Sequence, residues 1–274
     1  MKHKPIKIIL VLLLILIIIL TIIGEIPVVR NFKISSSKIS ENSTVKIVFL
    51  SDLHSCYYGK NQSQLVDIVN EANPDIVIFG GDFFDDKKSN TNSELIAKAL
   101  APLYPCYYAS GNHECWSGQL TNMKNYLRSC GVTVLDGECS TIEVNGNYID
   151  ICGIDDNYRG DEYVLKQLNR AYKESNSEHF RILVSHRPSL RYIYIHYDFD
   201  MILCGHAHGG QWKIPFTQTG VYTPHDGFFP HYVDGEYKLN DQSTMYVSRG
   251  LARESLPIPR FFNPPDIMIF EISG

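Results

Sequence analysis

The sequence predicts an α/β fold, and two observations carry the prediction. Short apolar runs rich in β-branched residues alternate along the chain with longer runs in which apolar residues recur at helical spacing. A hairpin pattern in the second half indicates a second sheet that packs on the first. With 274 residues, of which 44% are hydrophobic and 20% charged, the chain can form one large domain with a sizeable core.

The individual elements follow from local signals. A helix is expected to end before Pro74, and another begins at Asn92 or Ser93, which are good capping residues. The Asn145-Gly146-Asn147 turn joins two strands as a hairpin. The predicted strands are 45–50, 75–79, 106–109, 132–135, 141–144, 148–151, 180–184, 201–204, 245–247 and 267–271. The predicted helices are 62–72, 92–101, 118–130 and 161–173.

The N-terminus differs in composition from the rest of the chain. Residues 8–23 are aliphatic except for Thr21 and follow a basic head, whereas a membrane-crossing helix needs about 20 apolar residues. Since no small-x-small cleavage site follows, an anchor or uncleaved signal over 1–29 is favoured over a cleaved signal peptide or a buried helix. The charge asymmetry then predicts a single-pass protein of the cell membrane with its main domain outside the cytoplasm. Residues 30–43 form a linker or edge segment, and the main domain spans 44–274.

The net charge and the cysteine content limit the binding partners and the disulfides that can be expected. The formal net charge is -5, so the chain lacks the basic footprint of a nucleic-acid-binding protein. Its seven cysteines are odd in number and include no Cys-x-x-Cys pair, and their spacing predicts no disulfide. Nothing in the sequence indicates a protein partner.

Five short polar blocks lie at the carboxyl ends of predicted strands. In open α/β sheets, loops leaving the carboxyl ends of neighbouring strands converge on one ligand site. Carboxylate, imidazole and amide side chains in these blocks are ligands for divalent cations. The blocks are Asp52-Leu53-His54, Gly81-Asp82, Gly111-Asn112-His113-Glu114, His186 and Gly205-His206-Ala207-His208.

Spacing supports the chemistry of the blocks. Asp52 and His54 are alternate residues, which share one side of an extended segment, as do His206 and His208. Asp82 follows two glycines, which allow a close backbone approach, and its carboxylate could bridge two cations.

Other readings of single blocks stay open. Asp52 could simply cap a turn, Asn112 and His113 could be loop residues, and the imidazole of His186 could be satisfied locally. If the blocks form a site, His113 suits general acid chemistry on a leaving oxygen. The acids Asp85 and Asp86 are expected to be solvated.

The ordered set of blocks resembles the motifs of the calcineurin-like metallophosphoesterase superfamily. Residues 205–211 (Gly-His-Ala-His-Gly-Gly-Gln), 248–251 (Ser-Arg-Gly-Leu) and 260–265 (Arg-Phe-Phe-Asn-Pro-Pro) resemble its membrane-associated bacterial branch. The resemblance covers nearly everything after the N-terminal segment. It implies a four-layer sandwich, in which two mixed β-sheets are flanked by helices, and the composition of the N-terminus places a membrane helix before this domain.

The resemblance also implies a set of site residues. One metal ion would be held by Asp52, His54 and His208. The other would be held by Asn112, His186 and His206, with Asp82 bridging the two. A hydroxide shared by the ions would attack phosphorus in line while His113 assists the leaving oxygen. Manganese is the first expectation for both ions, and iron or zinc also fits mixed nitrogen and oxygen ligands.

Two arginines and several aromatic residues could contact the substrate or serve only the fold. Arg249 and Arg260 could bind phosphate because a guanidinium is planar and permanently charged, or they could be structural. The aromatic residues could line a groove for a lipid-like substrate, although plain packing explains them as well. They are Phe228, Phe229, Tyr232, Phe261 and Phe262.

These observations predict a metal-dependent phosphoesterase that cleaves phosphodiester or pyrophosphate bonds, with a lipid-linked or cell-envelope compound as substrate. Two alternatives remain. One is a hydrolase that splits the pyrophosphate of a UDP-linked acylated glucosamine in lipid A synthesis, which requires a domain facing the cytoplasm. The other is a non-catalytic scaffold with the same fold, which an intact set of seven ligand positions disfavours.

Overall fold

The computed structural model describes residues 4–217, 219–224, 226–253 and 259–274. Its main helices are α1 (Lys4–Gly24), α2 (Ser63–Ala72), α3 (Thr91–Leu100), α4 (Asn112–Trp116), α5 (Leu120–Ser129), α6 (Asp161–Glu174) and α7 (Arg191–Tyr194). Its strands are β1 (Val28–Ser35), β2 (Thr44–Leu50), β3 (Ile76–Phe79), β4 (Cys106–Tyr108), β5 (Thr133–Val134), β6 (Glu138–Val144), β7 (Asn147–Gly153), β8 (Phe180–Val184), β9 (Met201–Cys204), β10 (Tyr222–Thr223), β11 (Gly227–Phe228), β12 (Gly235–Lys238), β13 (Thr244–Val247) and β14 (Asp266–Ser273).

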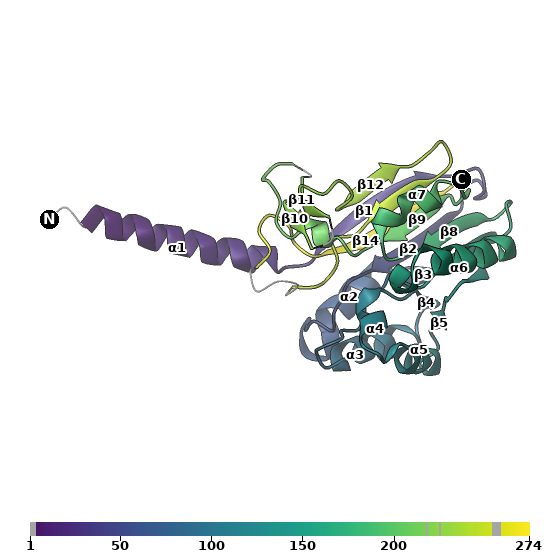
Figure 1. The fold of residues 1–274 in the computed structure, drawn as a ribbon, viewed down its shortest axis with the longest axis horizontal. Coiled ribbons are helices and arrows are strands. Elements are labelled where there is room, and N and C mark those ends of the chain that lie inside the picture. The colour runs from purple at the N-terminus through teal and green to yellow at the C-terminus, as the bar shows by residue number, and fades with distance from the viewer. Residues whose placement is uncertain (1–3, 218, 225, 254–258) are drawn as a thin grey trace.

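Two six-stranded sheets form the centre of the molecule (Figure 1). The first has the order β1-β14-β2-β3-β4-β5, and only its β14–β2 pair is antiparallel. The second has the order β12-β13-β9-β8-β7-β6, with antiparallel pairs at its two edges. The predicted α/β class with two mixed sheets is confirmed.

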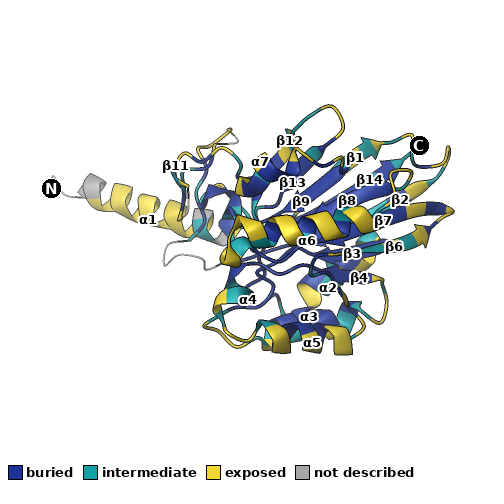
Figure 2. Cartoon of the chain, turned by 45° about the vertical axis from the view of Figure 1, so that its right-hand side comes forward, coloured by how far each residue is buried: buried dark blue, intermediate teal, exposed yellow. Residues whose placement is uncertain are grey.

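Alternation along the strands sorts the core into layers. On β2, Val45, Ile47 and Phe49 face the second sheet, whereas Val48 and Leu50 face α2, α3 and α5. A third apolar layer lies between the second sheet and the helices α6 and α7. Figure 2 shows α6 lying along its sheet with an exposed outer face and a buried inner one. The order is therefore helices, sheet, sheet, helices.

The N-terminal prediction needs correction. The helix α1 extends away from the two sheets (Figure 1). A bilayer crossing needs about 20 apolar residues in one run. Among the residues that the structure describes, no helix is both long enough and apolar enough for such a crossing. The predictions of a membrane helix and of a single-pass location in the cell membrane are therefore contradicted.

Several elements had no clear signal in the sequence. Most of β1 lies in the segment expected to be a linker or edge, and it pairs in parallel with β14 from the other end of the chain. The five-residue helix α4 begins within a polar block. Between β9 and β13, the described residues form one 3-10 turn (His208–Gly210) and short strands. Strands such as β1 and β14, which pair from opposite ends of the chain, cannot be matched from local periodicity.

Candidate active site

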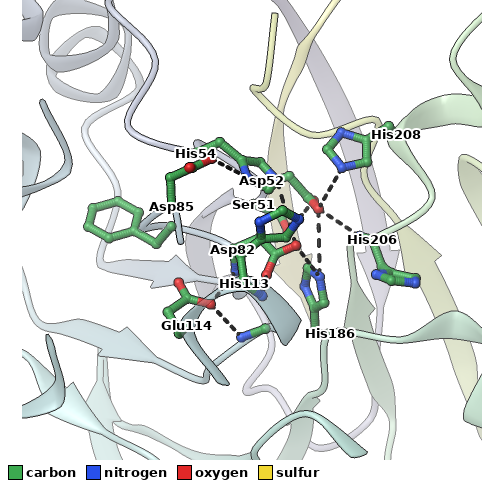
Figure 3. Close-up of polar contacts among 12 residues, drawn as sticks. Ser51, Asp52, His54, Asp82, Asp85, His113, Glu114, His186, His206 and His208 are labelled. Atoms are coloured by element: carbon green, nitrogen blue, oxygen red, sulfur yellow. Dashed lines mark hydrogen bonds and ion pairs between the residues drawn. The ribbon is translucent and has the colours of Figure 1, made fainter. Parts of the chain in front are cut away.

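The five polar blocks meet at one end of the two sheets. Asp52 and His54 follow β2, Asp82 follows β3, and Asn112 opens α4 just beyond β4. These residues come from the first sheet. The second sheet contributes His186 after β8, and His206 and His208 after β9. Figure 3 shows the side chains from both sheets turned toward one another.

Interatomic distances define a tight cluster around the two aspartates. His186 Nε2 lies 3.1 Å from Asp82 Oδ2 and 3.7 Å from Asp52 Oδ1. His54 Nε2 lies 3.6 Å from Asp82 Oδ2, and His208 Nε2 lies 3.6 Å from Asp52 Oδ1. These contacts bring imidazole nitrogens from both sheets to the same two carboxylates.

Within the cluster, two groups of three residues have the spacing of metal ligands. Asp52, His54 and His208 form one group, and Asp82, His186 and His206 form the other. In each group the ligand atoms lie within 4.8 Å of one another. A third group consists of His54, Asp85 and His113.

The backbone of the cluster is strained. Asp52, His54, Asp82, His206 and His208 all have positive φ, from 45° to 68°. Residues other than glycine rarely occupy this left-handed region, and each such residue costs about 1–3 kcal/mol. The surrounding hydrogen bonds hold the conformation: Asp52 N–H donates to Gly81 O, and His54 N–H donates to Asp82 O, both at 2.9 Å.

Three buried ligand atoms make no hydrogen bond. His54 Nε2, His186 Nε2 and Asn112 Oδ1 are inaccessible to solvent and make no hydrogen bond. Leaving a buried polar atom unpaired costs about 1–3 kcal/mol, so native structures avoid it unless another group occupies the position. Nitrogen and oxygen atoms in this arrangement fit divalent cations.

The charges in the cluster are strongly coupled. Burial alone would raise the pKa of Asp82, but the neighbouring His186 holds it well below its usual range. Burial would lower the pKa of His186, but Asp82 and Asp52 raise it to about 10. The two buried carboxylates thus create a negative potential at the centre of the cluster. A divalent cation bound there could neutralise it.

Two acids that were expected to be solvated belong to the site instead. Asp85 is buried, and its Oδ2 lies 3.2 Å from His54 Nδ1. Asp86 Oδ1 lies 2.6 Å from His113 Nδ1. Each carboxylate can accept the Nδ1 proton of its histidine and so directs Nε2 toward the cluster. The sequence placed both acids in a loop and gave no sign of their partners.

Glu114 connects the loops that carry the ligands. Its Oε2 accepts hydrogen bonds from the backbone N–H groups of Asp82 and Gly111, at 3.0 and 2.9 Å. Its Oε1 accepts a third from Phe84 N–H at 3.0 Å. This fully buried side chain therefore fixes the loop after β3 against the start of α4. The motif contained Glu114, but its spacing did not reveal this role.

The two tail arginines lie at different depths. Arg249 Nε donates to Asp234 Oδ2 at 2.5 Å, and Arg249 does not line the pocket at the cluster. This placement favours a structural role over the predicted phosphate contact. Arg260 is fully buried, with Nη2 3.2 Å from His208 Nδ1. A further arginine, Arg187, lies 3.2 Å from His206 Nε2 and was not predicted.

A pocket of about 250 Å³ opens over the cluster. Its walls include the side chains of His113, Trp116, Gln211 and Tyr222 as well as several ligands. Phe228, Phe229 and Tyr232, which were considered for a lipid groove, line a different pocket together with Arg191.

Comparisons with known proteins agree with this geometry. Residues 45–210 match the family model of the calcineurin-like phosphoesterases. The chain is 30% identical to the metallophosphoesterase YkuE of Bacillus subtilis, over 84% of this chain and 79% of that protein. It is 26% identical to the phosphodiesterase YaeI of Escherichia coli, over 83% of this chain and 82% of that protein. The chain therefore belongs to the calcineurin-like phosphoesterase family.

A solved structure shows the same fold. Phosphopantetheinyl hydrolase from Mycobacterium tuberculosis superposes with a TM-score of 0.52 at 12% identity, covering 76% of this chain and 90% of that one. The chain spans 50% to 58% of the length of other curated relatives, from Caenorhabditis elegans and Helicobacter pylori.

Proposed function

We propose that this protein is a metal-dependent phosphoester hydrolase with two divalent cations at the cluster. The supporting observation is the pair of three-residue ligand groups, in which two buried atoms, His54 Nε2 and His186 Nε2, make no hydrogen bond. Family membership and the phosphodiesterase named among the relatives agree with this activity.

The ligands divide between two positions. Asp52, His54 and His208 would hold one cation. His186, His206 and Asn112 would hold the other, and the central carboxylate of Asp82 would contact both. When bound, such a pair of cations supplies an activated water and neutralises charge on the phosphoryl oxygens. Manganese is our first expectation for the metal.

The chain's own residues supply the proton chemistry. His113 lines the pocket, and Asp86 at 2.6 Å can accept its Nδ1 proton. This contact turns Nε2 toward the pocket, where His113 would protonate the departing oxygen. Asp85 orients His54 in the same way, and Glu114 keeps the loop of Asp82 in register with α4.

We infer that the substrate carries a phosphodiester or pyrophosphate bond and that it is a lipid-linked or cell-envelope compound. The relative named phosphodiesterase supports the diester. The pocket combines apolar walls at Trp116 and Ala207 with the polar cluster at its floor, so one phosphate and an organic substituent can be accommodated together.

The test uses the purified chain. Metal content per chain is measured, together with hydrolysis of bis-p-nitrophenyl phosphate and of p-nitrophenyl phosphate with added manganese. About two metal ions and faster hydrolysis of the diester are expected. A folded protein that binds no metal and hydrolyses neither ester would contradict the proposal and favour a non-catalytic scaffold.

The variant His113→Ala tests whether His113 acts as a proton donor or as a metal ligand. His113→Ala should slow turnover of esters with poor leaving groups while the metal content stays near that of the unmodified protein. Loss of metal in this variant would instead make His113 a ligand, as the group of His54, Asp85 and His113 would allow.

A further inference from the structure

A second pocket is lined mainly by α5 and α6, and none of the proposed metal ligands lines it. Its volume of about 510 Å³ is about twice the 250 Å³ of the pocket over the cluster. The turn at 157–159 and the loops after β5 and β7 complete its walls. The lining residues are Leu120, Thr121, Lys124, Arg128, Asp136, Asp155, Tyr158, Arg159, Tyr163, Lys166, Gln167 and Arg170.

The walls of this pocket carry an excess of positive charge. Five of the lining residues are lysine or arginine and two are aspartate. The whole chain, in contrast, has a formal net charge of -5. A concave surface with one sign of charge raises the local concentration of ions of the opposite sign. We therefore expect this pocket to attract anions.

Both aspartates of the pocket are already paired with basic side chains. Lys124 Nζ lies 2.6 Å from Asp155 Oδ1 and 3.2 Å from Asp136 Oδ2. Arg128 Nη2 also lies 3.2 Å from Asp136 Oδ2. The hydroxyl group of Tyr163 donates a further hydrogen bond to Asp155 Oδ2 at 3.1 Å. These two carboxylates therefore do not balance the charge of the other basic residues in the walls.

Two of the remaining basic residues have no acidic partner. Arg170 Nη2 lies 2.5 Å from Glu138 Oε1, and Glu138 does not line the pocket. Arg159 and Lys166 form no ion pair with any acid in the described parts of the chain. The pocket thus contains two positive charges that its own carboxylates leave unbalanced.

Two tyrosines hold the guanidinium group of Arg159 in place. Its Cζ atom lies 5.1 Å from the ring centre of Tyr158 and 5.2 Å from that of Tyr163. Cation–π contacts of this kind restrict a long side chain that would otherwise be mobile. The planar fork of N–H donors on a guanidinium matches the oxygens of a phosphate group.

We propose that this pocket is a second anion site and that it binds a phosphate group through Arg159 and Lys166. A phosphate group carries a charge of about −1.5 to −2 at pH 7, so it can balance both basic residues at once. A carboxylate, with a single charge, cannot. The inference is independent of the proposed function, because it uses no residue of the metal cluster.

The test measures protection of one arginine in the purified chain. Phenylglyoxal modifies arginine side chains, and peptide mass spectrometry gives the rate at each position. Phosphate should slow the modification of Arg159 relative to acetate at the same ionic strength and pH. Arg191 is the matched control, because it also lies over a tyrosine ring, that of Tyr232 at 4.6 Å, and lines another pocket. Its rate should be the same in both salts.

A pair of variants on α6 tests the second basic residue. Lys166→Gln should raise the phosphate concentration that gives half-maximal protection of Arg159 by about two- to fivefold, the range of one exposed ion pair. Lys173→Gln changes an exposed lysine of the same helix that does not line the pocket, and it should have no effect.

Comparing inorganic phosphate with methylphosphonate distinguishes free phosphate from a phosphate ester as the source of the bound group. Protection at lower concentration by either one supports the site and identifies the source. Equal protection by acetate would overturn the phosphate assignment. Protection of Arg191 to the same extent as Arg159, no protection of Arg159, or no effect of Lys166→Gln would overturn the site. Hydrolytic activity is not measured, so failure of the proposed function would leave these results unchanged.

Discussion

The contact between Asp86 and His113 allows a sharp test of the proton donor. The two side chains meet at 2.6 Å, and both are mostly buried. In Asp86→Asn the shape is retained, but the acceptor loses its charge, and the amide can offer either a donor or an acceptor to Nδ1. The ring of His113 should therefore be held less firmly in the orientation that the Asp86 contact imposes.

The expected magnitude follows from the strength of the contact. A hydrogen bond to a charged group contributes about 1.5–3 kcal/mol, and each 1.36 kcal/mol corresponds to a tenfold change in rate. Asp86→Asn should lower kcat about 10- to 100-fold for a diester with an alkyl leaving group. A p-nitrophenolate leaves without protonation, so the rate with bis-p-nitrophenyl phosphate should change less than threefold, well below the tenfold that 1.36 kcal/mol would give.

The assay measures kcat for both esters together with metal content. Asp85→Asn is the matched control, because Asp85 contacts His54, a proposed metal ligand. This variant should bind less metal and should therefore hydrolyse both esters more slowly, by the same factor. Equal slowing of both esters by Asp86→Asn, or loss of metal from that variant, would refute the assignment of Asp86 to the proton donor.

Three further predictions concern charge and stability. Asp82→Asn should lower both metal content and turnover, because the Asp82 carboxylate is proposed to contact both cations, and unchanged turnover would argue against two metals. Glu114 controls a pH effect: burial first, and then Asp82, raises its folded-state pKa from 4.5 to about 7. The folded protein therefore holds this proton more tightly than the unfolded chain does, so the contribution is greatest below about pH 4.5 and falls by about 3 kcal/mol as the pH rises to about 7. Urea unfolding of metal-free protein should show this loss in the unmodified chain and not in Glu114→Gln, and identical pH profiles would contradict it. Arg249→Ala should leave KM for bis-p-nitrophenyl phosphate within about twofold while lowering stability by roughly 1–3 kcal/mol, because Asp234 loses a buried partner; a large rise in KM would restore Arg249 to the substrate site.

The sequence predicted most of the sheets and the members of the cluster for a physical reason. Each strand leaves its own signature of short, apolar, β-branched residues, and the ligands come at the ends of those strands. His186 and Asp82, more than 100 residues apart, could be placed together because carboxyl ends of strands in stacked sheets share an edge.

The supporting contacts could not be predicted in the same way. Asp85 and Asp86 looked like solvated loop acids, since their partners His54 and His113 come from other loops. For Arg249 the sequence left a phosphate contact and a structural role open, because its partner Asp234 sits in a segment without regular periodicity. The apolar composition of residues 8–23 alone suggested a membrane span, which the described helices do not provide.

Five proposed metal ligands have backbones in the left-handed region, and this affects how the protein would respond to selection for thermal stability. Five such residues, at about 1–3 kcal/mol each, store an amount of strain comparable to the entire stability of an ordinary domain. Substitutions that let these loops relax would raise the thermal stability of the protein but would destroy the proposed metal site. Screening variants for thermal stability alone would therefore enrich inactive ones, and thermostabilising changes that preserve the centre should be sought in the strands and helices away from the loops.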